Sequence, residues 1–197
     1  MACDNFLWFP TAAVGGLLST KATQPTGEST DKWMGMQSSY KALEVLSFNF
    51  GCAQAETGGS ATGGASAGKA KFEEFSIEKY VDLASVPLYN ACAAGAHFPS
   101  VMLAIRKAGG SNLLYLQFIF RMVFVTGVNW SGGSGEENCK ETIKFKYYAL
   151  GVQYVRQKPD GTGDTPIAGS WSMNQNNNSL DVQGLSGAPN YVNPSQS

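Results

Sequence analysis

The residues Gly63 to Lys69 match GxxxxGK, the pattern of a phosphate-binding loop. In such a loop, backbone amides and the lysine bind phosphate, a hydroxyl side chain after the lysine binds magnesium, and a helix follows directly. Here Ala70 replaces the hydroxyl residue, and the sequence from Lys71 to Ile77 is typical of a strand. We therefore predict a loop between strands at this place, with no nucleotide or other cofactor bound.

The single histidine, His97, could serve as a general base for Ser100 or for a cysteine. No GxSxG nucleophile elbow, the strand-to-helix turn that carries the serine of serine hydrolases, is recognisable, nor is a cysteine-protease signature, and a histidine just after a helix commonly interacts with the helix's terminal carbonyls. The adjacent glutamates at 73–74 and 136–137 would point to opposite faces of a strand, which disfavours a glycosidase-like pair. We predict no catalytic site; an enzyme built on His97 or on the glycine-rich loop is the rival class.

The four cysteines, Cys3, Cys52, Cys92 and Cys139, are far apart in the chain and form no CxxC pair. With one histidine and no paired cysteines, the sequence offers no ligand set for a structural zinc site. Free cysteines behave as small apolar residues in a reducing compartment. We predict free, mostly buried thiols and no bound metal.

The 197 residues include 14 basic and 15 acidic side chains, and 15% of the chain is charged, against a typical value of about 25%. A net charge of −1 excludes the usual polybasic nucleic-acid binder, and an apolar fraction of 43% excludes wholesale disorder. The most apolar stretch, Leu113–Val125, is too short for a membrane-spanning helix, and no signal peptide is recognisable. We expect a cytoplasmic chain, not inserted in a membrane, with part of its surface covered by a partner.

Alternating apolar residues predict a mainly β fold of about seven strands. The predicted strands include 46–50, 75–78, 101–106 and 114–124, the last with its even-numbered apolar residues on one face, and a final strand at 167–173 after a turn at 158–161. Between 141 and 156 the apolar phase shifts by one residue after Tyr147, which predicts a bulge or a corner between two sheets.

One short helix is predicted, around Val86–Ala94. Ser85 is the expected N-cap, Pro87 lies in the first turn, where proline is tolerated, and Gly95 is placed to end the helix. Together the elements favour a β-barrel of two sheets with one flanking α-helix.

We assign residues 1–175 to one barrel domain and 176–197 to a flexible tail. Within the domain, residues 10–40 form a long loop or insertion and Thr57–Gly68 a loop of small residues. Loops of such length are usually functional, and small residues permit close approach of another backbone.

Long strands with few charged residues leave edges that are prone to pair with another chain. A closed ring of identical copies satisfies such edges without open-ended aggregation. We therefore expect a ring-forming protein. A monomeric ligand-binding β-barrel with covered edges is the alternative.

Seven segments, in this order, resemble the Hcp family (haemolysin co-regulated protein), the tube subunit of the bacterial type VI secretion system. They are EVLSFNFG (44–51), SATGGASAGK (60–69), FSIEKYVDLAS (75–85), ACAAGAH (91–97), IRKAGG (105–110), GGSG (132–135) and QKPDG (157–161). The Gly-Glu-Ser triplet at 27–29 also matches. The stretch between Phe9 and Gly27 is longer than in the family, and Ser170 separates Gly169 from Trp171 where the family commonly has Gly-Trp.

The resemblance implies a two-sheet β-barrel like that of contractile phage tail tubes, assembled as hexameric rings that stack into a hollow tube. It implies effector proteins carried in the lumen, a contractile sheath and a spike as partners, and export without a cleaved signal peptide. The candidate contact residues between subunits or rings are Gly27, Glu28, Ser29, Thr30, Asp31, Gly58, Gly59, Gly63, Gly64 and Gly68.

Overall fold

A computed structural model describes residues 3–17, 24–30, 41–56, 67–108, 113–135 and 137–182. Its strands are β1 (Cys3–Trp8), β2 (Leu43–Val45), β3 (Ser47–Asn49), β4 (Cys52–Glu56), β5 (Ala67–Phe72), β6 (Phe75–Tyr80), β7 (His97–Lys107), β8 (Leu114–Ser131), β9 (Lys140–Lys146), β10 (Ala149–Tyr154) and β11 (Ile167–Ser172). The described part has one helix, α2 (Ser85–Ala94). No helix in this part of the chain has the length and the apolar sequence of a membrane-spanning segment.

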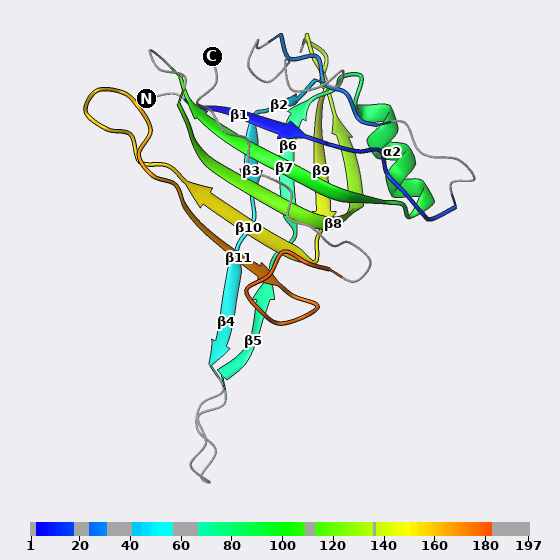
Figure 1. Cartoon of the computed structure of the whole chain (residues 1–197). Coiled ribbons are helices and arrows are strands. Elements are labelled where there is room, and N and C mark those ends of the chain that lie inside the picture. The colour runs from blue at the N-terminus through cyan, green and yellow to red at the C-terminus, as the bar shows by residue number, and fades with distance from the viewer. Residues whose placement is uncertain are drawn as a thin grey trace.

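Nine strands form one antiparallel sheet that folds over itself, with the order β2-β1-β7-β8-β9-β6-β3 and with β10 and β11 branching from β8. The first half of β8 pairs with β10 and its second half with β9, so this long strand belongs to both layers (Figure 1). A separate hairpin, β4–β5, projects from the body. The mainly β fold with one helix is confirmed. The sheet does not close into a barrel, because its path ends at β2 and β3.

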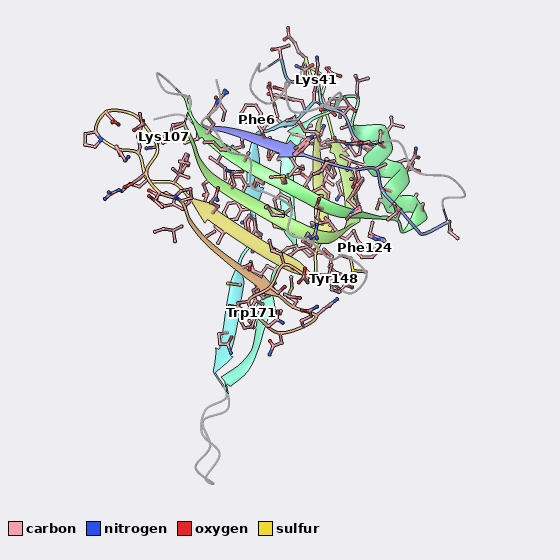
Figure 2. All side chains as sticks on the ribbon, viewed as in Figure 1. Phe6, Lys41, Lys107, Phe124, Tyr148 and Trp171 are labelled. Carbon is pink, nitrogen blue, oxygen red and sulfur yellow. The ribbon has the colours of Figure 1, made fainter. Side chains whose placement is uncertain are left out.

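The predicted corner after Tyr147 is confirmed. β9 ends at Lys146 and pairs with β6, whereas β10 begins at Ala149 and pairs with β11. Opposite this break, Met122 of β8 has a φ of 50°, a value that side-chain-bearing residues rarely adopt, and the Tyr148 amide donates to the Arg121 carbonyl at 3.0 Å. Phe124 and Tyr148 lie beside each other at this corner, with ring centroids 6.0 Å apart (Figure 2).

The apolar pattern of the sequence and the observed burial differ at three places. Past Met122 the buried residues of β8 are Val123 and Val125, because the turned backbone moves the odd-numbered side chains into the core. In β10 the buried phase does not shift, so apolar residues at even positions stay exposed at Val152 and Tyr154. Leu46 is also exposed, since it links β2 to β3 rather than belonging to one continuous strand.

The core is built around phenylalanines from both layers. Phe120 stacks on Phe75 with ring centroids 4.3 Å apart and planes at 9°, and Phe75 in turn stacks on Phe145 at 5.4 Å. Leu88 and Ala91 of α2 are completely buried against the same cluster. The core therefore joins both layers and the helix into one unit.

The helix ends as predicted but begins differently. Gly95 adopts the left-handed conformation with φ 65° and closes the helix. Ser85 is the first residue of α2 rather than its cap, and Ala84 occupies the N-cap position without a side-chain hydrogen bond. The Ser85 hydroxyl is directed elsewhere: it accepts the Asp82 amide and donates to the Glu141 carboxylate.

The predicted tail, 176–197, is divided by the structure. Its first part packs on the domain: the Ser172 amide donates to the Asn177 carbonyl, the Ser172 hydroxyl donates to the Asp181 carbonyl, and Val182 is buried. Residues 183–197 lie outside the described residues. The domain therefore extends to at least Val182.

Candidate functional site

The predicted contact residues at 27–30 lie along the start of β2 and beside the entry to α2. The Gly27 amide donates to the Lys41 carbonyl at 2.9 Å, and the Glu28 carboxylate accepts the Leu83 amide at 3.1 Å. Gly27 and Ser29 are buried within the single chain, which leaves Glu28 and Thr30 exposed. Asp31, Gly58, Gly59, Gly63 and Gly64 lie outside the described residues, and Gly68 falls within β5.

Gly27 has a packing role inside the subunit. A Cβ atom at this position would lie 2.1 Å from the carbonyl oxygen of Ala42, which is backbone and cannot swing away. We expect Gly27→Ala to lower the free energy of unfolding by about 1–3 kcal/mol, the usual cost of overpacking, as measured by urea unfolding. Gly127→Ala is the control, because a Cβ there meets no atom closer than 3.9 Å. Equal stability of the two variants would contradict this role.

Three edges of the large sheet are unpaired among the described strands. β2 pairs only with β1, β3 only with β6, and β11 only with β10. β11 is also largely exposed, with the Ile167 side chain 74% accessible. An edge of this kind presents a row of backbone donors and acceptors to another chain.

A groove, here called the ribbon groove, separates the β10–β11 ribbon from the β4–β5 hairpin. Its volume is about 350 Å³. Its lining is mostly apolar and consists of Cys52, Gln54, Ala70, Phe72, Leu150, Val152, Gly169, Ser170 and Trp171. Trp171 projects from β11 at this place (Figure 2). The groove continues the apolar surface beyond the core, because Leu150 pairs with Phe120 of the core, and Val152 pairs with Phe118, which packs against the core.

A second apolar surface, here called the helix patch, consists of Leu83, Val86, Tyr89 and Trp130. Their accessible fractions are 67%, 65%, 49% and 52%. The rings of Tyr89 and Trp130 lie 5.6 Å apart. The α2 sequence SVPLYNACAA contains no charged residue, and apart from Asn90 its large exposed side chains are apolar. A helix with apolar side chains on its exposed side as well as its buried side is normally covered by other protein.

A buried ionic network connects the helix patch to the interior of the subunit. The Lys79 ammonium lies 2.8 Å from the Glu141 carboxylate and 2.7 Å from that of Asp82, and the Lys79 and Glu141 side chains are completely buried. Glu141 also accepts the Ser85 hydroxyl at 2.7 Å and the Trp130 indole N–H at 2.8 Å. The network therefore ties β6, β9, the start of α2 and the end of β8 together. It also fixes Trp130 in one orientation.

The described residues that were considered for catalysis do not form a comparable network. The backbone of His97 pairs with Val14, its ring lies 5.3 Å from the Phe124 ring, and burial lowers its pKa. As predicted, a strand rather than a helix follows the GxxxxGK sequence, but this strand, β5, begins at Ala67 and already includes Gly68 and Lys69, which were predicted to lie in a loop. Among the described residues, no group of three or more His, Cys, Asp or Glu side chains could hold a metal ion.

All four cysteines are free, as predicted, but the prediction that most are buried is wrong. Cys3, Cys52 and Cys139 are exposed and Cys92 is partly buried. Cys3 and Cys52 are the first residues of β1 and β4, and Cys139 immediately precedes β9, so they sit at strand ends rather than in the core. Cys3 contacts the Tyr115 hydroxyl at 3.5 Å; this hydrogen bond, followed by burial, raises the pKa of Tyr115 to about 12.

Comparison with known proteins gives consistent results. Residues 19–154 match the family model described as "Type VI secretion system effector, Hcp". The chain is 36% identical over 110 residues to protein hcp1 of Pseudomonas aeruginosa, covering 55% of this chain and 68% of that protein.

Two solved structures share most of the fold. A structure described as a type six secretion system protein has a TM-score of 0.75 and 29% identity, covering 90% of this chain and 100% of the other. Hcp1 from Salmonella typhimurium has a TM-score of 0.65 and 26% identity, covering 90% and 99%.

Proposed function

Since the chain belongs to the Hcp family and is a subunit of the type VI secretion tube, we propose that six copies close into a ring and that such rings stack into the hollow tube. The observation that carries the proposal is that edge strands of the large sheet, β2 and β11 among them, have a partner on one side only among the described strands. Ring closure lets such edges pair with neighbouring copies without open-ended aggregation. The two exposed apolar surfaces support the same conclusion, because contiguous exposed apolar patches often mark sites of protein–protein contact.

In this proposal the ring is a carrier rather than a catalyst. Effector proteins bind in its lumen, the contractile sheath surrounds the stacked rings, and a spike closes the tip. Contraction drives the tube out of the cell, so the chain leaves the cytoplasm without cleavage of a signal peptide. The sparse chemistry around His97 supports a role without a catalytic step.

The mass of the assembly tests the proposal. Sedimentation velocity of the purified chain across a wide dilution series is expected to give a particle of about 126 kDa, six times the chain mass of 21.0 kDa. Electron microscopy of the same sample is expected to show a six-fold annulus. A single species near 21 kDa at every concentration would contradict the ring and favour the monomeric ligand-binding barrel.

A further inference from the structure

We propose that neighbouring subunits join by insertion of the helix patch of one copy into the ribbon groove of the next. This inference rests on the proposed ring and names the two surfaces that form its repeated contact. The occupant of both surfaces is a second copy of this chain: each copy supplies the helix patch at one junction and the ribbon groove at the other.

The helix patch has the properties of an interface centre. Its four side chains expose on the order of 400 Å² of apolar surface, a size at which a patch on a monomer is often functional. A standard interface buries about 800 Å² on each partner, with apolar and aromatic residues at its centre and few charges there. Leu83, Val86, Tyr89 and Trp130 supply such a centre.

Trp130 is held in place before any partner arrives. Its indole N–H is bonded to Glu141, whose carboxylate is fixed by Lys79 and Ser85. An exposed aromatic side chain that is already ordered loses little conformational entropy on binding. Tryptophan and tyrosine are also the residues that most often dominate binding energy.

The ribbon groove provides the matching concave surface. Its 350 Å³ are bounded by Phe72 on the hairpin side and by Val152 and Trp171 on the ribbon side. Gly169 of β11 leaves its floor open, because a Cβ atom built there meets no other atom within 4 Å. Tyr154 and Ile167, which are exposed on the same ribbon, extend the apolar surface past the groove.

The elements that carry the two surfaces are well separated in the fold. In Figure 1, α2 lies on the right, and β10 and β11 lie to the left of it and below it. A contact between two different surfaces of identical chains is heterologous, and it generates a ring when the rotation from copy to copy closes. Two different surfaces that do not overlap are what each member of such a ring requires.

One substitution in each of the two surfaces is designed to disrupt the contact and to leave the subunit folded. Val86→Glu places a charge in the helix patch; because α2 has no acidic residue in its first turn, the helix dipole favours this glutamate. Gly169→Phe fills the ribbon groove from its open floor. We expect each variant to sediment as a folded monomer, with its assembly weakened by at least about 30-fold. Lys71→Glu is the control, because Lys71 lies between the groove residues Ala70 and Phe72 and points away from the groove.

Mixing the two variants is the decisive experiment. The Val86→Glu chain keeps an intact ribbon groove and the Gly169→Phe chain keeps an intact helix patch, so the mixture is expected to form one junction and stop at a two-chain particle of about 42 kDa. Circular dichroism verifies that each variant is folded, and Tyr89→Glu replaces Val86→Glu if that variant is not.

Every other result of these experiments contradicts one of the two proposals. Rings that persist in either single variant, or a mixture that stays monomeric, would overturn the pairing of these two surfaces while leaving the hexamer intact as a proposal. A wild-type chain that is itself monomeric would instead contradict the proposed function.

Discussion

The Lys79→Met variant is expected to lose about 3–5 kcal/mol of its free energy of unfolding, the usual consequence of removing one partner from a buried ion pair. Lys79 is the only cation in the network described above, and its ammonium lies within 2.8 Å of both the Asp82 and Glu141 carboxylates. Without it, two negative charges face each other, and Glu141 is completely buried. Urea unfolding at one fixed protein concentration measures the loss.

Two matched variants separate this cause from a general effect of the substitution. Lys140→Met removes an exposed lysine that lies 3.4 Å from Glu78, and pairs of this kind contribute at most about 1 kcal/mol. Adding Glu141→Gln to Lys79→Met removes one of the two uncompensated charges and is expected to restore part of the stability. If Lys79→Met and Lys140→Met are equally stable, the buried network has no special role in the fold.

The same network shows where the sequence could have been interpreted further. Lys79 has the same phase as Phe75 and Ile77 in β6, and Glu141 the same phase as Ile143 and Phe145 in β9. Two opposite charges, each on the apolar face of a strand, indicate a buried pair. Their partnership could not be predicted, because it depends on β6 and β9 being neighbours, which follows from topology rather than from local pattern.

Local rules succeeded where a short segment decides its own conformation. Pro87 in the first turn and Gly95 at the end fixed the extent of α2, and the phase slip after Tyr147 marked the corner between layers. The same slip does not report burial. The even-numbered apolar residues of β10 are not all in the core, since Val152 and Tyr154 are exposed beside the ribbon groove.

The exposure of these apolar residues has a physical explanation in the proposed assembly. Alternation reports which face of a strand is apolar, but not whether the subunit itself or a neighbour covers that face. The apolar residues of α2 present the same ambiguity, since Leu88 and Ala91 are buried within the subunit and Val86 and Tyr89 are not. Positions where an apolar pattern and exposure disagree are therefore the best guide to the surfaces that join the copies.

Phe120→Ala is expected to cost about 3–5 kcal/mol, because it removes a buried aromatic ring and leaves a cavity that the surrounding sheet cannot fill. Phe120 is completely buried and lies at the centre of the aromatic cluster. Its ring stacks on Phe75 at 4.3 Å and meets the edges of Phe50 and Tyr147 at 5.2 and 5.0 Å. The contacts join β8 to β6 and to the corner between β9 and β10, so the loss acts on both layers of the sheet.

Two comparisons show whether the loss arises from this position in the cluster. Phe120→Leu keeps most of the volume and is expected to cost clearly less than Phe120→Ala, since the cost follows the size of the cavity. Phe124→Ala, in the same strand but half-buried beside His97, removes an identical side chain from the edge of the fold. Unfolding in urea is expected to rank Phe120→Ala as the least stable of the three. Equal losses for Phe120→Ala and Phe124→Ala would mean that the stacked cluster is not the structure that holds the two layers together.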